Sequence, residues 1–227
     1  MDKINTKSIF VFDAFGTLFK TSEIEEDLKS IAGSKTESLI SVWRKKQLEY
    51  TWLRNQMNQY APFDEVTKEA LDYSMRLHGL DEPKIFDWLL PIYDQPSLID
   101  GVGEVLIALQ TKGIKIGILS NGTMPMLKNG VRKTGIENII DFIFSADEIG
   151  VYKPRSEVYQ MAMDNLNTSV NELLFISSNQ WDVSGASNFG WECVWLNRSH
   201  TVSEKLPFGK VTEINDVNQL PGLFFNH

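Results

Sequence analysis

Short apolar runs, rich in β-branched and aromatic residues, recur along the chain. They occupy residues 9–12, 114–119, 142–144, 173–176 and 193–196. Such unbroken apolarity is typical of the central strands of a parallel sheet, which helices cover on both faces. Amphipathic stretches at 103–109 and 158–166 predict helices between the runs. The alternation predicts an α/β fold whose core is a doubly wound, Rossmann-like parallel sheet.

Residues 21–97 interrupt this rhythm. Apolar residues recur there at helical spacing, first between 39 and 53 and then between 66 and 77, and no candidate strand separates them. Pro91 and Pro96 stand near the end of the region, where a chain break is expected. The simplest interpretation is an all-helical cap, residues 21–97, inserted into a core domain made of residues 1–20 and 98–227.

Composition narrows the class of protein. The chain has 227 residues, of which 42% are hydrophobic, enough for one substantial core with a smaller module. A net charge of −8 argues against a nucleic acid or an anionic membrane as partner. The single cysteine, Cys193, lies in an apolar run and is expected to be a buried, inert thiol. With no apolar leader or membrane-length run, we expect a soluble, cytoplasmic protein.

Several common chemistries have no motif in this chain. Its three histidines, His78, His200 and His227, lie far apart, so no histidine pair with zinc-binding spacing occurs. Neither a Gly-x-Ser-x-Gly elbow nor a Gly-x-x-x-x-Gly-Lys-Ser/Thr phosphate loop is present. The remaining candidates for catalytic residues are the polar residues that follow the apolar runs.

Polar residues stand at the end of each of the first four segments. Asp13 follows the first run, residues 120–122 follow the second, 152–154 follow the third, and 177–182 follow the fourth. Ligands of doubly wound sheets bind outside the carboxyl ends of the strands. Taken singly, each residue has an ordinary structural role, since a strand-end aspartate is commonly a turn former or a helix cap. Their shared position at successive strand ends predicts one catalytic site.

These segments resemble those of the haloacid dehalogenase superfamily, and in detail its L-2-haloacid dehalogenase branch. The matching segments are 13–17, 119–122, 151–154, 177–182 and, in the cap, 43–54. The resemblance covers essentially the whole chain. It implies a hydrolase with an aspartate nucleophile on a Rossmann-like core with a helical cap.

Two positions distinguish this chain from the phosphatases that make up most of the superfamily. Phe15 stands where those enzymes have a carboxylate that protonates the leaving alkoxide, a function that halide does not need. Ser178 stands where they place a magnesium-binding aspartate, and Asp13 with Asp182 alone would make a poor octahedral site. We therefore expect a metal-independent enzyme with no cofactor.

The resemblance implies hydrolytic dehalogenation of (S)-2-haloalkanoic acids to (R)-2-hydroxyalkanoic acids and halide. Asp13 would attack C2 of the substrate from the side opposite the halogen and form an aspartyl ester. Water would then cleave that ester at the Asp13 carboxyl carbon. One displacement at C2 inverts its configuration.

The resemblance also carries residue roles onto this chain. The implied catalytic residues are Asp13, Thr17, Arg44, Ser120, Lys153, Tyr159, Ser177, Asn179 and Asp182. The implied substrate-binding residues are Ala14, Phe15, Arg44, Lys45, Leu48, Phe63, Ser120, Asn121 and Trp181.

Five of these residues are expected to act on the nucleophile or on water. Thr17 and Ser177 would hold Asp13 by hydrogen bonds. Lys153 would orient Asp13 and balance its charge against that of Asp182. Asn179 and Asp182 would position or activate the hydrolytic water.

Other residues are expected to contact the substrate. Ser120, with main-chain N–H groups around Asn121, would hold the substrate carboxylate at a helix N-terminus. Arg44 would capture the halide from the cap, the alternative being a solvated helix arginine. Tyr159 would hydrogen-bond the substrate or Arg44, with simple packing as the alternative. Lys45 departs from the glutamine that the family often has.

Other functions remain open from the sequence. They are a phosphatase or phosphonatase, a related carbon-substrate hydrolase that acts on fluoroacetate or a strained-ring amino acid, and a catalytically silent binding module. Relatives are commonly dimers, and exposed apolar residues expected on the cap helices, Trp52 and Met57, suit a homodimer.

Overall fold

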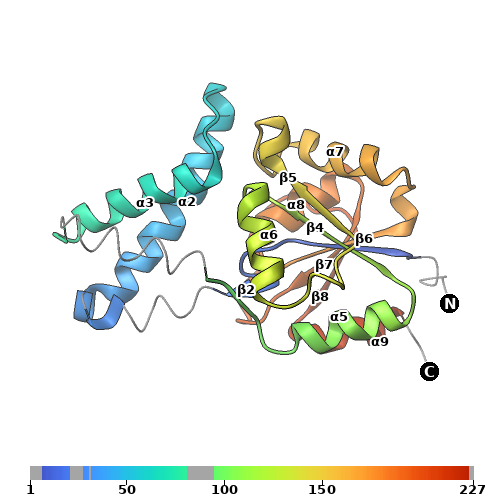
Figure 1. The fold of residues 1–227 in the computed structure, drawn as a ribbon. Coiled ribbons are helices and arrows are strands. Elements are labelled where there is room, and N and C mark those ends of the chain that lie inside the picture. Colours follow the sequence, from blue (N-terminus) through green and yellow to red (C-terminus); the bar gives the residue numbers. More distant parts are fainter. Residues whose placement is uncertain (1–6, 21–27, 31, 81–94, 225–227) are drawn as a thin grey trace.

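The computed structural model describes residues 7–20, 28–30, 32–80 and 95–224. Figure 1 shows a sheet with helices packed on both of its faces, and two further helices that stand to one side of it. Among the described residues, no helix is long and apolar enough to cross a membrane.

A six-stranded parallel sheet forms the core, in the order β5-β4-β1-β6-β7-β8. Its strands are β1 (Ile9–Phe12), β4 (Lys115–Ser120), β5 (Phe142–Ser145), β6 (Leu173–Ser177), β7 (Glu192–Leu196) and β8 (Val211–Ile214). The order changes direction around β1, which pairs with β4 on one side and with β6 on the other. The predicted doubly wound α/β fold is confirmed.

Five strands match the five apolar runs, but the sequence did not predict β8. Two of its four residues are exposed and only Ile214 is buried. An edge strand with one buried residue has too little apolar character to resemble a central strand. Also unpredicted is a two-stranded antiparallel sheet, β2 (Phe19–Lys20) and β3 (Ser97–Leu98).

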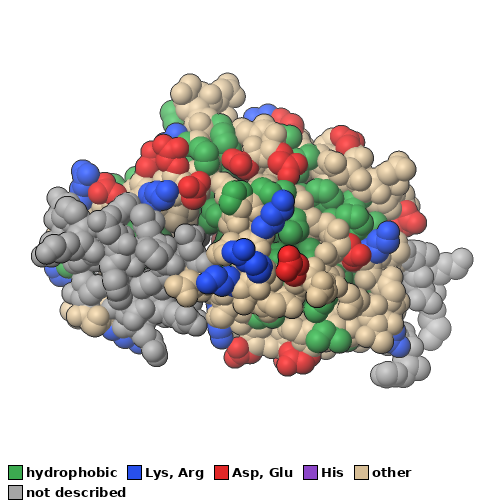
Figure 2. All heavy atoms as spheres, viewed as in Figure 1, with side chains coloured by type: hydrophobic (Ala, Val, Ile, Leu, Met, Phe, Trp, Pro, Cys, Tyr) green, Lys and Arg blue, Asp and Glu red, His purple; other side chains and the backbone are tan. Residues whose placement is uncertain are grey.

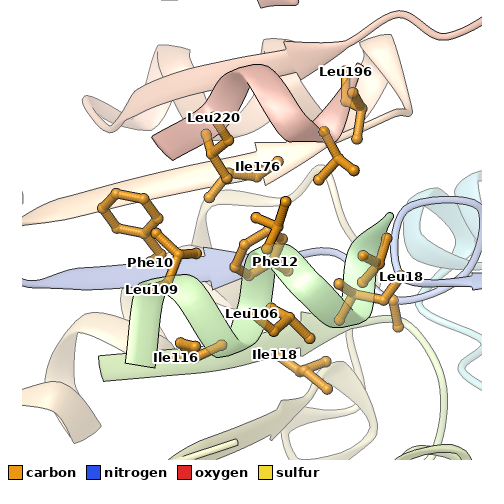
Figure 3. Close-up of a cluster of buried hydrophobic side chains, with 14 of the residues drawn as sticks. Phe10, Phe12, Leu18, Leu106, Leu109, Ile116, Ile118, Ile176, Leu196 and Leu220 are labelled. Atoms are coloured by element: carbon orange, nitrogen blue, oxygen red, sulfur yellow. The ribbon is translucent and has the colours of Figure 1, made fainter. Parts of the chain in front are cut away.

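Side chains alternate between the two faces of the sheet and so build two apolar layers. Phe10 and Phe12 of β1 point into the layer covered by α5 (Val102–Thr111), α6 (Met124–Lys133) and α9 (Leu220–Phe224), part of which Figure 3 shows. Ile9 and Val11 point into the layer covered by α7 (Ser156–Leu166) and α8 (Gln180–Phe189). Cys193 is buried in this second layer, and burial raises the pKa of its thiol, as expected for an inert cysteine.

The described residues between β2 and β3 form helices and loops, as predicted for the cap. Helix α2 (Thr36–Met57) packs along α3 (Phe63–Leu77). The Trp43 indole of α2 donates to the Thr67 carbonyl of α3 over 3.0 Å. Short 3-10 helices occur at Gly33–Lys35, Ala146–Ile149, Val170–Glu172 and Val217–Gln219. The cap boundaries at 21 and 97 remain a prediction, because residues 21–27 and 81–94 lie outside the described residues.

On the face of the molecule drawn in Figure 2, lysine and arginine side chains lie interspersed with aspartate and glutamate, and apolar side chains lie between them. This distribution agrees with the modest excess of acidic residues over basic ones in the chain.

Candidate active site

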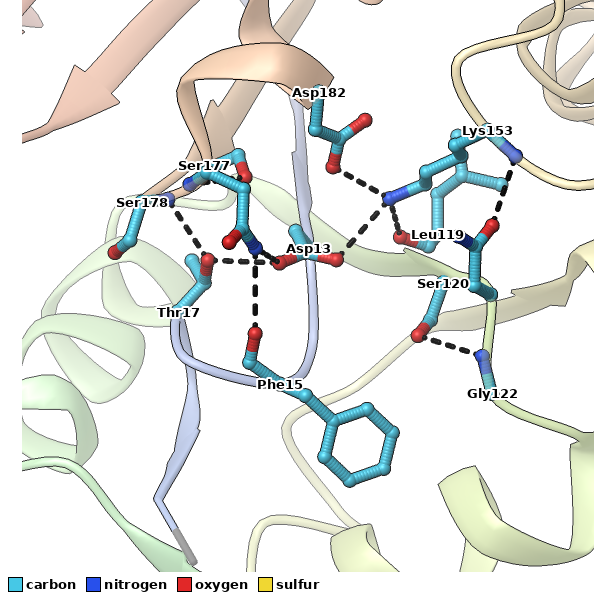
Figure 4. Close-up of polar contacts among 12 residues, drawn as sticks. Asp13, Phe15, Thr17, Leu119, Ser120, Gly122, Lys153, Ser177, Ser178 and Asp182 are labelled. Atoms are coloured by element: carbon cyan, nitrogen blue, oxygen red, sulfur yellow. Dashed lines mark hydrogen bonds and ion pairs between the residues drawn. The ribbon is translucent and has the colours of Figure 1, made fainter. Parts of the chain in front are cut away.

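The carboxyl ends of the three central strands bring the predicted polar residues together (Figure 4). Asp13 follows β1, Ser120 ends β4 and Ser177 ends β6. The Asp13 main-chain N–H donates to the Ile176 carbonyl over 2.9 Å, which continues the ladder between β1 and β6 and fixes the start of the Asp13 side chain. The site therefore rests on the central strands of the sheet.

The two oxygens of the Asp13 carboxylate have different surroundings. Oδ2 accepts hydrogen bonds from Thr17 Oγ1 at 3.0 Å and from Asn179 Nδ2 at 2.8 Å. Oδ1 accepts one from Lys153 Nζ at 3.2 Å. The residue is only 6% exposed. A carboxylate bound in this way has one oxygen committed to two donors and one oxygen less firmly held.

Lys153 is fully buried, and its ammonium group donates three hydrogen bonds within the protein. Its Nζ donates to Asp182 Oδ2 at 2.8 Å and to the Leu119 carbonyl at 2.5 Å, in addition to Asp13. Burial by itself would lower the pKa of Lys153, but the charges of Asp182 and Asp13 outweigh it and raise the pKa. Lys153 is therefore an ammonium ion held between two carboxylates.

Asp182 lies in the first turn of α8 and is completely buried behind Lys153. Its Oδ1 accepts from the Tyr159 hydroxyl at 2.8 Å. Burial raises the pKa of Asp182 to about 6, although Lys153 opposes the shift. Burial and the neighbouring Asp182 charge also raise the pKa of Tyr159 well above its usual value, so the phenol remains a neutral donor. Tyr159 thus supports Asp182 and lies within the core.

The residues after β6 form a loop that holds the nucleophile. The Ser178 main-chain N–H donates to Thr17 Oγ1 at 2.9 Å, and the Ser177 hydroxyl accepts from the Asn179 main-chain N–H at 3.1 Å. Ser177 therefore positions Asn179, which in turn binds Asp13. This differs from the expected hydrogen bond between Ser177 and Asp13, because the Ser177 side chain folds back over its own loop.

After β4, Asn121 presents an unsatisfied donor. Its Oδ1 accepts from the Lys153 main-chain N–H at 2.9 Å, which fixes the orientation of the amide. Its Nδ2 is buried and has no hydrogen-bond partner among the described residues. An unpaired buried N–H costs free energy, so this donor is suited to a ligand. The neighbouring Gly122 leaves room for the Phe15 ring, since a Cβ there would lie 2.8 Å from Phe15 Cε2.

A cavity of about 100 Å³ lies above Asp13, between core and cap. Its walls are Asp13, Phe15, Arg44, Gln47, Leu48, Phe63, Ser120, Asn121, Asn179 and Trp181. Nine of the predicted site residues are among these ten, all but Gln47, so residues far apart in sequence meet at one small pocket.

Helix α2 supplies the cap side of this cavity through Arg44, Gln47 and Leu48. Residues three and four apart share a helix face. Lys45, one position after Arg44, is turned about 100° away, is exposed, and is not a lining residue. Gln47 was not predicted, although its helical spacing from Arg44 places it on the same face of α2. The predicted residue Ala14 is buried in the apolar layer of α5 and α6.

Arg198, two residues after the end of β7, was also not predicted. Its guanidinium donates to the Gly16 carbonyl at 3.1 Å, the Thr17 carbonyl at 3.0 Å and the Ser178 hydroxyl at 2.9 Å. Applying the strand-end rule to the fifth apolar run would have found it, because β7 ends at the same edge of the sheet as β1 and β6.

The donors around Asp13 do not suit a magnesium ion. Asn179 Nδ2 lies 2.8 Å from Asp13 Oδ2 and 3.4 Å from the Phe15 carbonyl, so a nitrogen donor is shared by two oxygens that a cation would need. The Ser178 hydroxyl accepts from Arg198. Magnesium prefers near-octahedral oxygen ligands, and no group of three histidine, cysteine or acidic residues with metal-binding geometry occurs among the described residues.

Residues 7–190 match the family model described as haloacid dehalogenase-like hydrolase. (S)-2-haloacid dehalogenase 4A of Burkholderia cepacia is 38% identical over 189 residues, which cover 83% of this chain and 82% of that protein. (S)-2-haloacid dehalogenase 1 of Pseudomonas sp. strain CBS-3 is 36% identical, with 94% of each chain covered.

A solved structure shows the same similarity in three dimensions. It is the L-2-haloacid dehalogenase of Xanthobacter autotrophicus with chloropropionic acid covalently bound. It superposes with a TM-score of 0.87 and is 30% identical, and the alignment covers 96% of this chain and 98% of that chain.

Proposed function

The chain belongs to the haloacid dehalogenase-like hydrolase family, and on that premise we propose that it hydrolyses (S)-2-haloalkanoic acids to (R)-2-hydroxyalkanoic acids and halide. The reaction passes through an ester between Asp13 and C2 of the substrate. The main support for this proposal is that the two Asp13 oxygens accept different hydrogen bonds. This difference suits one oxygen to attack and the other to become the ester carbonyl.

Asp13 Oδ1 is the attacking oxygen. Oδ2 already accepts two hydrogen bonds, from Thr17 and Asn179, whereas Oδ1 accepts one, from Lys153, at the longer distance of 3.2 Å. Asp13 lines the cavity, so a carbon atom held there can be approached from its unoccupied side. Attack by Oδ1 displaces the halogen and leaves Oδ2 as the carbonyl oxygen of the ester.

The leaving group departs without a proton. Asp13 is the one acidic residue among the ten that line the cavity, and Asp182 is buried behind Lys153. An alkoxide or phosphate ester would need a general acid here, worth about 10²–10⁴-fold in rate. Halide needs none, so the pocket suits a carbon–halogen bond.

Donors on both sides of the cavity complement the charges of a haloacid. Ser120 and Asn121 line it from the core, and Asn121 Nδ2 has no hydrogen-bond partner in the part of the chain that the structure describes. Arg44 lines it from the cap. We assign the substrate carboxylate to Ser120 and Asn121, and the developing halide charge to Arg44. Such preorganised donors stabilise charge that grows in the transition state.

Hydrolysis of the ester uses the same contacts. When water attacks the Asp13 carboxyl carbon, negative charge develops on Oδ2, which Thr17 and Asn179 already bind at 3.0 and 2.8 Å. The oxygen that leaves with the product is Oδ1, which Lys153 contacts. Lys153 gives a proton to that oxygen as it becomes the hydroxyl of the 2-hydroxyacid and takes one back from the attacking water, while Asp182 holds Lys153 in place. The second proton of the water leaves to solvent as Asp13 returns to its carboxylate form.

Paired enantiomers of 2-chloropropionate test the proposal. Halide should be released from the (S) form only, at the same rate with and without EDTA. In single turnover in oxygen-18 water, the label should enter Asp13 and not the product, because the product oxygen is Oδ1. Label that appears first in the product would exclude the ester, and loss of halide release in EDTA would contradict a reaction that needs no metal.

We further propose that the enzyme works in the cytoplasm, without metal, as a homodimer. Met57 and Leu77, on the cap helices, are 58% and 60% exposed and offer apolar surface to a second copy. Trp52 does not, because it packs on Trp181. Light scattering of the purified chain tests the dimer, and cell fractionation tests the location.

A further inference from the structure

Arg198, in the segment after β7, contacts the loops around the nucleophile. Arg198 is half-buried, and the three oxygens that its guanidinium binds belong to two separate loops, Gly16 and Thr17 after β1 and Ser178 after β6. It does not line the cavity. We propose that Arg198 is a positioning residue that sets which Asp13 oxygen attacks the substrate, an inference that rests on the proposed function.

A chain of hydrogen bonds connects Arg198 to the nucleophile. Arg198 Nη1 donates to the Ser178 hydroxyl, and the Ser178 main-chain N–H donates to Thr17 Oγ1. The Thr17 hydroxyl, having accepted that bond, donates its own hydrogen to Asp13 Oδ2 at 3.0 Å. Arg198 Nη2 holds the Thr17 carbonyl at the same time. The guanidinium therefore fixes both ends of the bond between Ser178 and Thr17.

The same clamp also stabilises the second donor to Oδ2. Asn179 follows Ser178 in the chain, and its Nδ2 donates to Asp13 Oδ2 at 2.8 Å. If the loop after β6 moved relative to the loop after β1, both donors to Oδ2 would shift together. Without them Oδ2 is no longer the more firmly held oxygen, and the ester carbonyl loses the hydrogen bonds that stabilise its negative charge during hydrolysis.

The chemistry of arginine fits this role better than that of lysine. The guanidinium is planar and presents its N–H groups in a fixed fork, so it can hold three acceptors in a defined arrangement. The three acceptors of Arg198 are neutral, two carbonyls and one hydroxyl. A half-buried guanidinium loses part of its hydration, which costs free energy. Hydrogen bonds to neutral acceptors compensate for that cost less than an ion pair would, so Arg198 is expected to add little to the stability of the fold. Geometry accounts for its placement better than stability does.

Arg198→Ala should lower kcat for (S)-2-chloropropionate by about 10²-fold, the size of effect that a displaced reacting group produces. KM should change by less than about threefold, because the residues assigned to the substrate carboxylate are untouched. Guanidinium chloride at non-denaturing concentration should restore part of kcat to this variant. Arg198→Lys keeps the charge but loses the fork, and we expect a loss of about 10-fold.

Ser178→Ala provides a second measurement on the same chain of bonds. It removes one of the three acceptors, and the double variant with Arg198→Ala should be no slower than Arg198→Ala alone, since residues in one network are not additive. Arg54→Ala is the matched control. Arg54 also binds a carbonyl and a side chain, those of Gln59 and Glu69, but it lies in the cap and outside the cavity. Its kcat should stay within about twofold of wild type.

A wild-type kcat in Arg198→Ala would overturn the inference, as would a reduced kcat that guanidinium does not raise at all. If Arg198→Ala fails to fold, Arg198→Lys decides the question, and an unchanged kcat in that variant contradicts the role. Failure of the wild-type protein to release halide from any 2-haloacid would instead refute the proposed function.

Discussion

The two sides of the cavity are built differently. On the core side, Asp13, Lys153 and Asp182 are between 0 and 6% exposed, and each is bound by at least two partners. On the cap side, one face of α2 and the Phe63 ring provide most of the wall. Bond making requires fixed atoms, whereas enclosing a small substrate requires mainly shape. We therefore propose that the core holds the groups that make and break bonds at Asp13, and that the cap encloses the substrate and presents one charged donor, Arg44, to it.

The cap is nevertheless aligned to the core at a few defined points. The Asn55 side chain pairs with both main-chain groups of Tyr152, with distances of 2.8 and 2.9 Å. Tyr60 donates to Asp147 at 2.5 Å, and Trp52 meets Trp181 edge to face with ring centroids 5.7 Å apart. Tyr152 directly precedes Lys153, so the cap is attached next to the lysine that contacts the nucleophile.

Removing the nucleophile should have the largest effect. Asp13→Asn keeps the shape of the side chain but lacks a nucleophilic carboxylate, so halide release should fall by at least about 10⁴-fold. Circular dichroism and thermal unfolding should show an intact fold. Retention of more than about one hundredth of wild-type activity in freshly purified protein would mean that another group forms the ester.

Removing the cap arginine should have a smaller, but still large, effect. Arg44→Ala should lower kcat by about 10²-fold, the cost of losing one donor to a developing charge. The loss should be larger for chloride than for iodide, because the poorer leaving group depends more on stabilisation. Lys45→Ala, on the exposed neighbouring position, is the control and should leave the rate of halide release within about twofold of wild type. Equal losses in the two variants would remove Arg44 from the mechanism.

Acid should lower the activity of the enzyme through Asp182, although it does not destabilise the fold at that residue. Because the pKa of Asp182 in the folded protein is about 6, above the value of about 3.9 expected when unfolded, the folded state binds this proton more tightly. The contribution of Asp182 to stability is therefore complete below about pH 3.9 and is lost as the pH rises through 6. Activity follows the opposite trend, since neutral Asp182 no longer balances Lys153.

We therefore expect kcat to fall about 10-fold per pH unit below an apparent pKa near 6 that belongs to the whole Asp13, Lys153 and Asp182 cluster. Asp182→Asn removes the titrating group, so its kcat should be lower but flat between pH 5 and 7. A wild-type profile with no change across that interval would mean that Asp182 does not need to be ionised.

The core side could be predicted from the sequence because topology determines it. Any doubly wound sheet brings its strand ends to one edge, so Asp13, Ser120 and the 177–182 loop had to converge wherever the helices packed. Individual hydrogen bonds could not be predicted in the same way. The orientation of Ser177 toward Asn179 depends on side-chain rotation within a loop, which the order of residues does not specify.

The cap side could be predicted only in part, because it depends on how α2 rotates about its axis when it docks. Arg44 and Leu48 were identified by resemblance, and Lys45 was carried over with them although it faces away from the cavity. Helical periodicity alone would have grouped Arg44 with Gln47 and Leu48. The register between cap and core rests on contacts such as that of Asn55, which no local pattern reveals.

The smallest predicted effect concerns that contact. Asn55→Ala removes both hydrogen bonds to Tyr152, so the cap should sit less firmly over Lys153. We expect KM for 2-chloropropionate to rise about five-fold with kcat nearly unchanged, because enclosure of the substrate weakens while the groups around Asp13 stay in place. Asn165→Ala, which loses a local side-chain bond to the Met161 carbonyl on α7, controls for the loss of an asparagine. Should kcat fall with KM constant, the Asn55 contact would position the groups around Asp13 instead of closing the cap over the substrate.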